Sequence, residues 1–181
     1  VKARWLLDTF DPSGERARTG AIRLGTIDSW LLACMSGAHV IEAGNASRTQ
    51  LLNLAAVDWD DDLLGLFGVP RACLPEVLPS TGPFPAVRGL PPVKDGTPIH
   101  AVMGDSHAAL FGHGALSPGQ IKATYGTGSS VMGLLEAPGN LQSGLCLTIA
   151  WATDRPAYAA EGNIRSAGSA RSFAGKTTCR C

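Results

Sequence analysis

The chain has 181 residues, of which 45% are hydrophobic, and its 15 basic and 15 acidic side chains give a formal net charge of zero. These values exclude a disordered chain, and the lack of excess positive charge argues against a nucleic-acid partner, whose phosphates bind a basic surface. No run approaches the ~18 apolar residues of a membrane span, and the five cysteines are scattered without a C-x-x-C pair, so we expect a cytoplasmic protein with no membrane contact, disulfide framework or metal site.

At roughly 150 residues per domain, this length predicts one domain and a fraction. Residues 1–10 show a helical pattern in which Trp5, Leu6 and Phe10 make an apolar stripe. Because the chain begins at Val1 inside this pattern, we expect an internal fragment of a longer protein.

A second helix is predicted to begin near Thr26, and Gly37 stands where a left-handed cap would end it. Its apolar side chains recur at steps of three and four residues: Ile27, Trp30, Leu31, Cys34 and Met35. This spacing is typical of a helix with one buried face.

Residues 58–62 contain four aspartates and precede a third predicted helix, which Gly68 and Pro70 end. Acidic side chains in a first turn are stabilised by the positive end of the helix dipole, so we expect helix capping here. A metal site is the alternative, and it is disfavoured because carboxylates adjacent in sequence cannot converge on one ion.

Residues 75–98 hold seven prolines and predict an extended surface connection. A short buried strand is expected next at residues 99–103, and a helix rich in small residues at 106–116. Antiparallel strands in succession are predicted to follow, at residues 120–125, 130–135, 144–151 and 157–160. This change from strand and helix to a strand meander indicates a domain boundary near residues 112–118.

A first candidate site is Asp105, which directly follows the predicted buried strand. In open α/β sheets ligands bind at the carboxyl ends of strands. Asp105 could accept a proton from a substrate hydroxyl there, or it could cap the helix that follows. From the local sequence alone, capping is favoured.

A second candidate is the turn in which Gly126 and Gly128 flank Thr127. Two glycines let the backbone approach an anion closely, so the amides and hydroxyls could hold phosphate oxygens. A hairpin turn that needs positive φ explains the same residues equally well, and the pattern matches neither the P-loop nor the dinucleotide-binding fingerprint.

Ser106 raises a third hypothesis, because the Gly-Asp-Ser block ending there resembles the nucleophile block of GDS-type serine hydrolases. Such an enzyme needs a downstream Asp and His to activate the serine. After His107 only His113 follows, in the same predicted helix, so this alternative is disfavoured.

Taken together, the sequence blocks resemble the FGGY family of carbohydrate kinases, and within it most closely the glycerol kinases. They follow the family's order over about residues 1–170, at residues 2–8, 25–31, 45–49, 58–61, 69–71, 74–77, 104–105, 108–112 and 125–128. So many blocks in one order make coincidence implausible.

The resemblance implies a partial actin-like, ribonuclease H-like ATPase fold of the α/β class, with domains that close around ATP, Mg²⁺ and a polyol or sugar. It gives Asp105 the role of catalytic base, which also orients the acceptor hydroxyl, and this role now outweighs capping. Thr127, with Gly126 and Gly128, matches a position that contacts the nucleotide phosphates, and Gly168 matches another nucleotide-binding position. The resemblance also allows a homo-oligomer of the full-length protein, because oligomers are common in this family.

Two departures from the glycerol kinases affect the substrate pocket. Ser106 stands where those enzymes have Gln directly after the catalytic Asp, and Ser130 where they have Phe. Two small hydroxyl side chains in place of an amide and an aromatic ring predict a larger and more polar pocket, hence a longer polyol or a sugar as acceptor.

The resemblance divides the chain into residues 1–113, the end of a first (substrate) domain, residues 114–170, the start of a second (nucleotide) domain, and a divergent tail at 171–181. The family's first phosphate loop and its adenosine site have no counterpart here, so we expect this stretch to be inactive by itself. For the tail we expect a shifted reading frame or a truncated gene. A non-catalytic relic or interaction module of the same fold is the alternative function.

Overall fold

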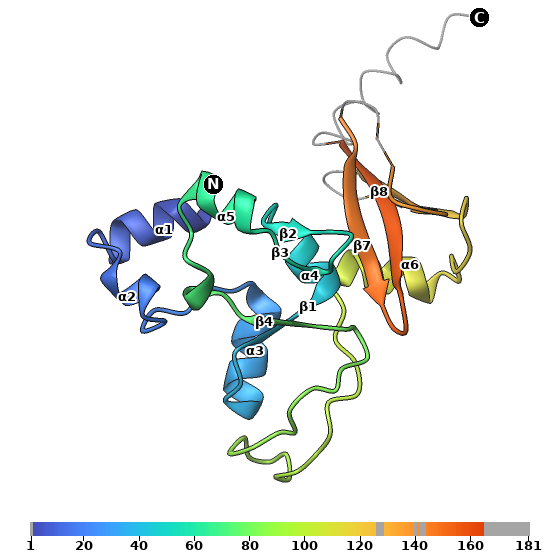
Figure 1. Ribbon diagram of the computed structural model, residues 1–181. Helices are drawn as coiled ribbons and strands as arrows, with labels where there is room; N and C mark the ends of the chain where they lie inside the picture. Colours follow the sequence, from blue (N-terminus) through green and yellow to red (C-terminus); the bar gives the residue numbers. More distant parts are fainter. Residues whose placement is uncertain (1, 126–128, 140, 142–143, 165–181) are drawn as a thin grey trace, which may run out of the picture.

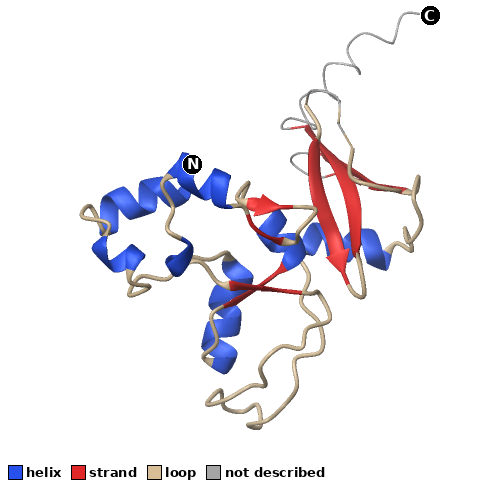
Figure 2. Ribbon diagram, in the orientation of Figure 1, coloured by secondary structure: helices blue, strands red, loops and turns tan. Residues whose placement is uncertain are grey.

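The computed structural model describes residues 2–125, 129–139, 141 and 144–164, and it shows a mixed α/β chain in two parts (Figure 1). The first part is mainly helical, and the second is a four-stranded sheet with one helix against it (Figure 2). The first part contains α1 (Lys2–Phe10), α2 (Glu15–Arg18), α3 (Ile27–Ser36), β1 (Val40–Glu42), α4 (Ala43–Ser47), β2 (Leu52–Asn53), β3 (Asp58–Trp59), α5 (Asp61–Phe67), the 3₁₀ turn η1 (Arg71–Cys73) and β4 (Glu76–Leu78). The second part contains α6 (Asp105–Gly112), β5 (Ile121–Tyr125), β6 (Ser129–Leu135), β7 (Cys146–Ala152) and β8 (Pro156–Ile164).

Helix α1 forms where the sequence predicts it, but its predicted apolar stripe does not face the core. Leu7 is the buried side chain, at 2% exposure, while Trp5 and Phe10 are 63% and 64% exposed. The spacing of apolar residues therefore identified the helix and misidentified its buried face. Which face is covered depends on tertiary packing, and the spacing of apolar residues along the chain does not determine that packing.

Helix α3 is also confirmed, and Gly37 ends it in the left-handed conformation with φ at 77°. Its predicted stripe again lies outward, with Trp30 61% exposed, whereas Asp28 and Leu32 are buried. Asp28 Oδ2 accepts the backbone N–H of Glu42 at 3.0 Å. This buried carboxylate joins α3 to the end of β1, immediately before α4.

Helix α5 is capped as the acidic run predicts. Asp60 accepts the backbone N–H of Leu63 at 3.0 Å, and Asp61 is one of two aspartates in the first turn. Asp58 and Asp61 also pair with Arg71 of η1. In the part of the chain that the structure describes, no group of three or more His, Cys, Asp or Glu side chains is placed to hold a metal ion.

The first part of the proline-rich segment predicted as an extended connection, 75–98, instead contains β4, which pairs with β1. From residue 79 on, the segment is the extended connection that the sequence predicts, and residues 79–104 contain no helix or strand. The buried strand predicted at residues 99–103 is therefore wrong. This stretch is extended but half-buried or exposed, and one backbone hydrogen bond, from Val102 N–H to Ser80 C=O at 2.9 Å, ties it to a neighbour. A strand needs a continuous ladder of such bonds, and one contact does not make a ladder.

The four predicted antiparallel strands form, but their order across the sheet differs from their order in the sequence. The sheet has the order β5-β6-β8-β7, so β8 lies between β6 and β7. Two hairpins produce this arrangement: β5 pairs with β6, and β8 pairs with both β7 and β6, for example Ala159 with Thr148 and with Leu134. At nine residues, β8 is long enough to serve both neighbours.

Helix α4 lies between the two parts and packs on β7 (Figure 1). One apolar core runs through it, because Ala43 and Ala46 of α4 belong to the same buried cluster as Ile149 of β7. A second core lies between α6 and the sheet and includes Leu110 and Met132. None of the helices within the described residues is long and apolar enough to cross a membrane.

Candidate functional site

Asp105 opens helix α6, and Gly104 before it is the N-cap residue. The Asp105 side chain is exposed, and its Oδ1 accepts the backbone N–H of Ser106 at 2.6 Å. Lys122 of β5 donates from Nζ to the Ser106 carbonyl at 3.2 Å and is itself buried. The first turn of α6 is thereby fixed against the sheet.

A pocket of about 200 Å³ lies beside this turn. It is built from three parts of the chain: the segment that leads into α6, the end of α4, and the sheet. Its lining residues are Asn45, Arg48, Gly104, Asp105, Ser106, His107, Met132 and Glu161. The pocket therefore brings Asp105 and Ser106 together with charged and amide side chains from distant sequence.

Glu161 of β8 is the most deeply buried charge in this pocket, with its side chain 5% exposed. Ser130 Oγ donates to Glu161 Oε1 at 2.8 Å, and Arg48 Nη2 lies 2.5 Å from Glu161 Oε2. The Arg48 N–H groups are not aimed at that oxygen, so the contact is an ion pair without a directed hydrogen bond. Arg48 and Glu161 thus join α4 to the sheet across the pocket.

Glu42 lies behind the pocket and is fully buried. Its oxygens accept the backbone N–H groups of Gly44 and Asn45, both at 2.8 Å, the Asn45 Nδ2–H at 3.0 Å and the hydroxyl of Ser80 at 2.5 Å. Burial raises the pKa of Glu42, and these hydrogen bonds oppose the rise. The carboxylate holds the start of α4 and the Asn45 side chain in place.

His107 is buried against the same network. Its Nε2 lies 3.4 Å from Thr148 Oγ1, which is 2.6 Å from Ser47 Oγ. Burial, and secondarily the positive charge of Arg48, lower the pKa of His107 to about 4. The imidazole is therefore neutral at pH 7 and packs α6 on α4 and β7.

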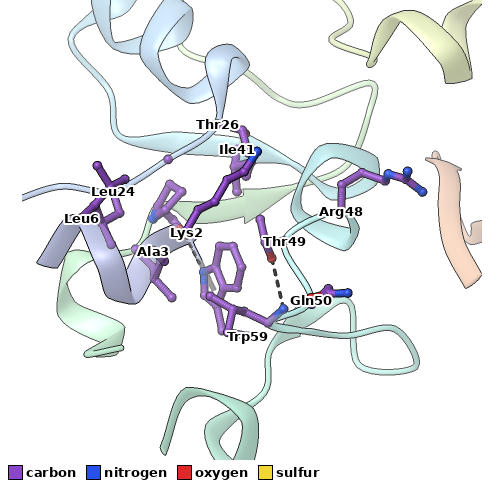
Figure 3. Close-up of a pocket in the computed structure, with 14 residues that line it drawn as sticks. Lys2, Ala3, Leu6, Leu24, Thr26, Ile41, Arg48, Thr49, Gln50 and Trp59 are labelled. Atoms are coloured by element: carbon purple, nitrogen blue, oxygen red, sulfur yellow. Dashed lines mark hydrogen bonds between the residues drawn. The ribbon is translucent and has the colours of Figure 1, made fainter. Parts of the chain in front are cut away.

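A larger cavity of about 570 Å³ lies on the other side of α4, next to α1 and β3 (Figure 3). Its walls are mainly apolar, and Trp59 donates from Nε1 to the Pro75 carbonyl at 2.7 Å. Arg48 is at its edge, but Figure 3 shows the guanidinium extending away from it toward the four-stranded sheet. None of the described residues that line this cavity is an aspartate or a glutamate.

The predicted site residues divide into two groups. Asp105 and Ser106 line one pocket, and Ser130 reaches its wall through Glu161. The predicted nucleotide-binding residues lie outside the described part of the chain: Gly126, Thr127, Gly128 and Gly168.

The structure adds three residues to which the sequence assigned no role: Asn45, Arg48 and Glu161. A signal for the first two was present, since an amide and a guanidinium three residues apart on a helix share a face.

Comparisons with known proteins extend these observations. A sequence profile described as "FGGY family of carbohydrate kinases, N-terminal domain" matches residues 1–112. A glycerol kinase of Acidiphilium cryptum is 40% identical over 176 residues, and an apulose kinase of Pectobacterium atrosepticum is 45% identical over 170 residues. These alignments cover 93% and 91% of this chain but 35% and 34% of the relatives, so the chain spans about a third of their length.

Solved structures show the same likeness. The glycerol kinase of Plasmodium falciparum, determined with ADP, matches with a TM-score of 0.88 at 29% identity, over 97% of this chain and 36% of that one. A xylulose kinase of Rhodospirillum rubrum matches with a TM-score of 0.79 at 20% identity, over 97% of this chain and 36% of that one, which is a likeness of fold.

Proposed function

The chain belongs to the FGGY family of carbohydrate kinases, and from this membership we propose that the protein transfers the γ-phosphoryl group of ATP to a hydroxyl group of a polyol or sugar. The family and the actin-like, ribonuclease H-like ATPase fold predicted from the sequence are confirmed. Asp105, exposed at the start of α6 in a pocket with polar walls, is the observation that carries the proposal.

Asp105 acts in this proposal as the base for the acceptor hydroxyl. Its Oδ1 is held by the Ser106 N–H, and Oδ2 has no hydrogen-bond partner among the described residues, so it can accept from a substrate hydroxyl. As the acceptor oxygen attacks the γ-phosphorus in line, the new P–O bond forms, the bond to the ADP oxygen breaks, and the hydroxyl proton passes to the carboxylate. Position matters more than basicity here, because the transition state is loose.

We assign the nucleotide to the Gly126–Thr127–Gly128 turn and to Gly168, as the sequence predicts. The glycerol kinase of Plasmodium falciparum was determined with ADP, which supports a nucleotide ligand for this fold. Mg²⁺ is proposed as the counter-ion of ATP. The described residues do not offer it a site, since Glu161 already pairs with Arg48 and no three His, Cys, Asp or Glu side chains among them are placed to hold a metal ion. No step above depends on Mg²⁺.

The acceptor is proposed to be a longer polyol or a sugar. Ser106 and Ser130 replace the Gln and Phe of glycerol kinases, and Ser130 places a hydroxyl on Glu161 where a ring would exclude polar groups. The apulose kinase relative is 45% identical and the glycerol kinase relative is 40% identical, so the comparisons support a sugar acceptor as well as they support glycerol.

A panel of acceptors tests both the proposed kinase activity and the proposed preference for a larger acceptor. The protein encoded by the complete gene is incubated with ATP and glycerol, erythritol, ribitol, D-ribulose or D-xylulose, and ADP release is followed. We expect turnover that depends on an acceptor, with a five-carbon compound faster than glycerol. Glycerol as by far the fastest acceptor would refute the larger substrate. No turnover with any kinase acceptor would favour the alternative, a non-catalytic relic of the fold.

Two further predictions stay proposals. The division into residues 1–113, 114–170 and 171–181 places the pocket where the first two segments meet, because Asp105 and Glu161 come from different ones. A cytoplasmic location is supported by the three described cysteines, Cys34, Cys73 and Cys146, which are free thiols.

A further inference from the structure

Helix α4 supplies the pocket with two polar side chains that the phosphoryl-transfer step does not use. Asn45 and Arg48 stand three residues apart at the end of α4, and both line the pocket with Asp105. Each is held by its own buried carboxylate, Asn45 by Glu42 and Arg48 by Glu161. Side chains fixed from behind in this way present their remaining polar atoms to the pocket.

The Asn45 amide has a defined orientation. Its Nδ2 donates to Glu42 Oε2 at 3.0 Å, and each Glu42 oxygen also accepts a backbone N–H, so this carboxylate is an acceptor and cannot face the amide oxygen. Asn45 Oδ1 points instead toward Gly104, where it lies 3.0 Å from the place that a Cβ would occupy. An amide oxygen is thus held beside Asp105, ready to accept a hydrogen bond.

Arg48 has donors to spare. One Nη2 contact to Glu161 is its only ion pair among the described residues, and its side chain is 38% exposed. Ser130 fixes the other oxygen of Glu161 at 2.8 Å, so the carboxylate that anchors the guanidinium does not rotate freely. The planar fork of an arginine carries five N–H donors, and most of these stay available at the pocket wall.

We propose that Asn45 and Arg48 bind hydroxyl groups of the acceptor: Asn45 Oδ1 accepts a hydrogen bond from one hydroxyl, and the Arg48 guanidinium donates to the oxygen of another. This inference rests on the proposed kinase function and names two residues that hold its acceptor. Together with the hydroxyl that Asp105 activates, the acceptor carries at least three hydroxyl groups, as glycerol, longer polyols and sugars do and a simple alcohol does not.

A purely structural role makes a different prediction. The Arg48–Glu161 ion pair also joins α4 to β8, so its loss could loosen the contact between the two parts of the chain. In that case the melting temperature would fall and the KM values of acceptor and ATP would change together. A binding role changes the acceptor KM alone.

The test uses the protein from the complete gene and the fastest acceptor of the panel named above. Arg48→Met and Asn45→Ala are each expected to raise the acceptor KM about tenfold or more, with the ATP KM within about twofold of wild type. Arg48→Lys keeps the positive charge but lacks the planar guanidinium, so its acceptor KM should lie between those of wild type and Arg48→Met. Arg71→Met is the matched control, because Arg71 is similarly exposed and paired with aspartates but lies away from this pocket.

The outcomes separate the two proposals. If wild type phosphorylates an acceptor and the Arg48 and Asn45 variants keep its KM, or change both KM values equally, the binding role is overturned and the kinase proposal stands. If wild type phosphorylates none of the panel, the kinase proposal fails, and this inference fails with it.

Discussion

Replacing Gly104 by alanine probes the close approach between α4 and the start of α6. Gly104 has φ −62° and ψ 148°, which alanine adopts freely, so the backbone adds no strain. The new Cβ would lie 3.0 Å from Asn45 Oδ1 and 3.6 Å from His107 Nδ1. The amide must move by a few tenths of an ångström, which weakens its hydrogen bond to the Glu42 carboxylate, and we expect a loss of about 1 kcal/mol out of the roughly 1.5–3 kcal/mol that such a bond contributes.

The same change reduces the entropy of the unfolded chain, which stabilises the fold by about 0.4–1 kcal/mol. The two effects nearly cancel, so the free energy of unfolding should change by less than about 1 kcal/mol. The acceptor KM should nevertheless rise about threefold, less than for Asn45→Ala, because a displaced Asn45 Oδ1 accepts a weaker hydrogen bond from the acceptor hydroxyl. Urea unfolding measures the first quantity and steady-state kinetics the second.

Gly112→Ala is the matched control, since it lies in the same helix and its Cβ would meet nothing within 4 Å. It should stabilise by about 0.5–1 kcal/mol and leave the acceptor KM unchanged. If Gly104→Ala behaved like this control in both measurements, the close approach would have no functional consequence and the reasoning would be refuted.

The remaining predictions concern stability and are measured by urea unfolding. Asp60→Ala removes the N-cap of α5 and should cost about 1 kcal/mol, whereas Asp62→Ala, which removes no described hydrogen bond, should cost less; equal losses would contradict the cap. Leu7→Ala should cost about 2–5 kcal/mol and Trp5→Ala under about 0.5 kcal/mol, and the reverse order would contradict the observed burial. Because the pKa of His107 is lowered to about 4, the unfolded state binds a proton between about pH 6.5 and 4 that the folded state does not, so stability falls as pH falls through this window. Relative to wild type, His107→Gln should remove about 2 kcal/mol of the loss between pH 7 and 5, and parallel pH curves would contradict this.

Local signals in the sequence predicted α1, α3, α5, α6 and the four strands of the sheet, but none of the short elements α2, β1, α4, β2, β3, η1 and β4. Helix α5, with its aspartate cap and terminal glycine, depends on neighbours within four residues, and so does the left-handed Gly37 that ends α3. The errors concern partners that are distant in sequence. The position of β8 inside the sheet, the exposure of Trp5 and the missing strand at residues 99–103 are set by which segments meet, and spacing along the chain does not record that.

The residues of the candidate site also fall into two groups, those that the sequence indicated and those that only folding brings together. Local sequence alone favoured a capping role for Asp105, and the resemblance to the FGGY family gave Asp105 its catalytic role and marked Ser106 as a departure in the substrate pocket. Arg48 and Glu161 are 113 positions apart, and only folding brings the guanidinium within 2.5 Å of the carboxylate. An arginine near the end of a helix has many possible roles in a sequence, and its place at the pocket follows from the packing of α4 against β7.

Asp105→Asn in the protein from the complete gene tests the role of the catalytic base most directly. Asparagine keeps the size of the side chain and an oxygen for the Ser106 N–H, but it cannot take the proton of the acceptor hydroxyl. We expect kcat to fall by about 10²- to 10⁴-fold while the Kd of ATP, measured by calorimetry, stays at the wild-type value. A kcat equal to that of wild type would contradict the assignment of Asp105 as the base.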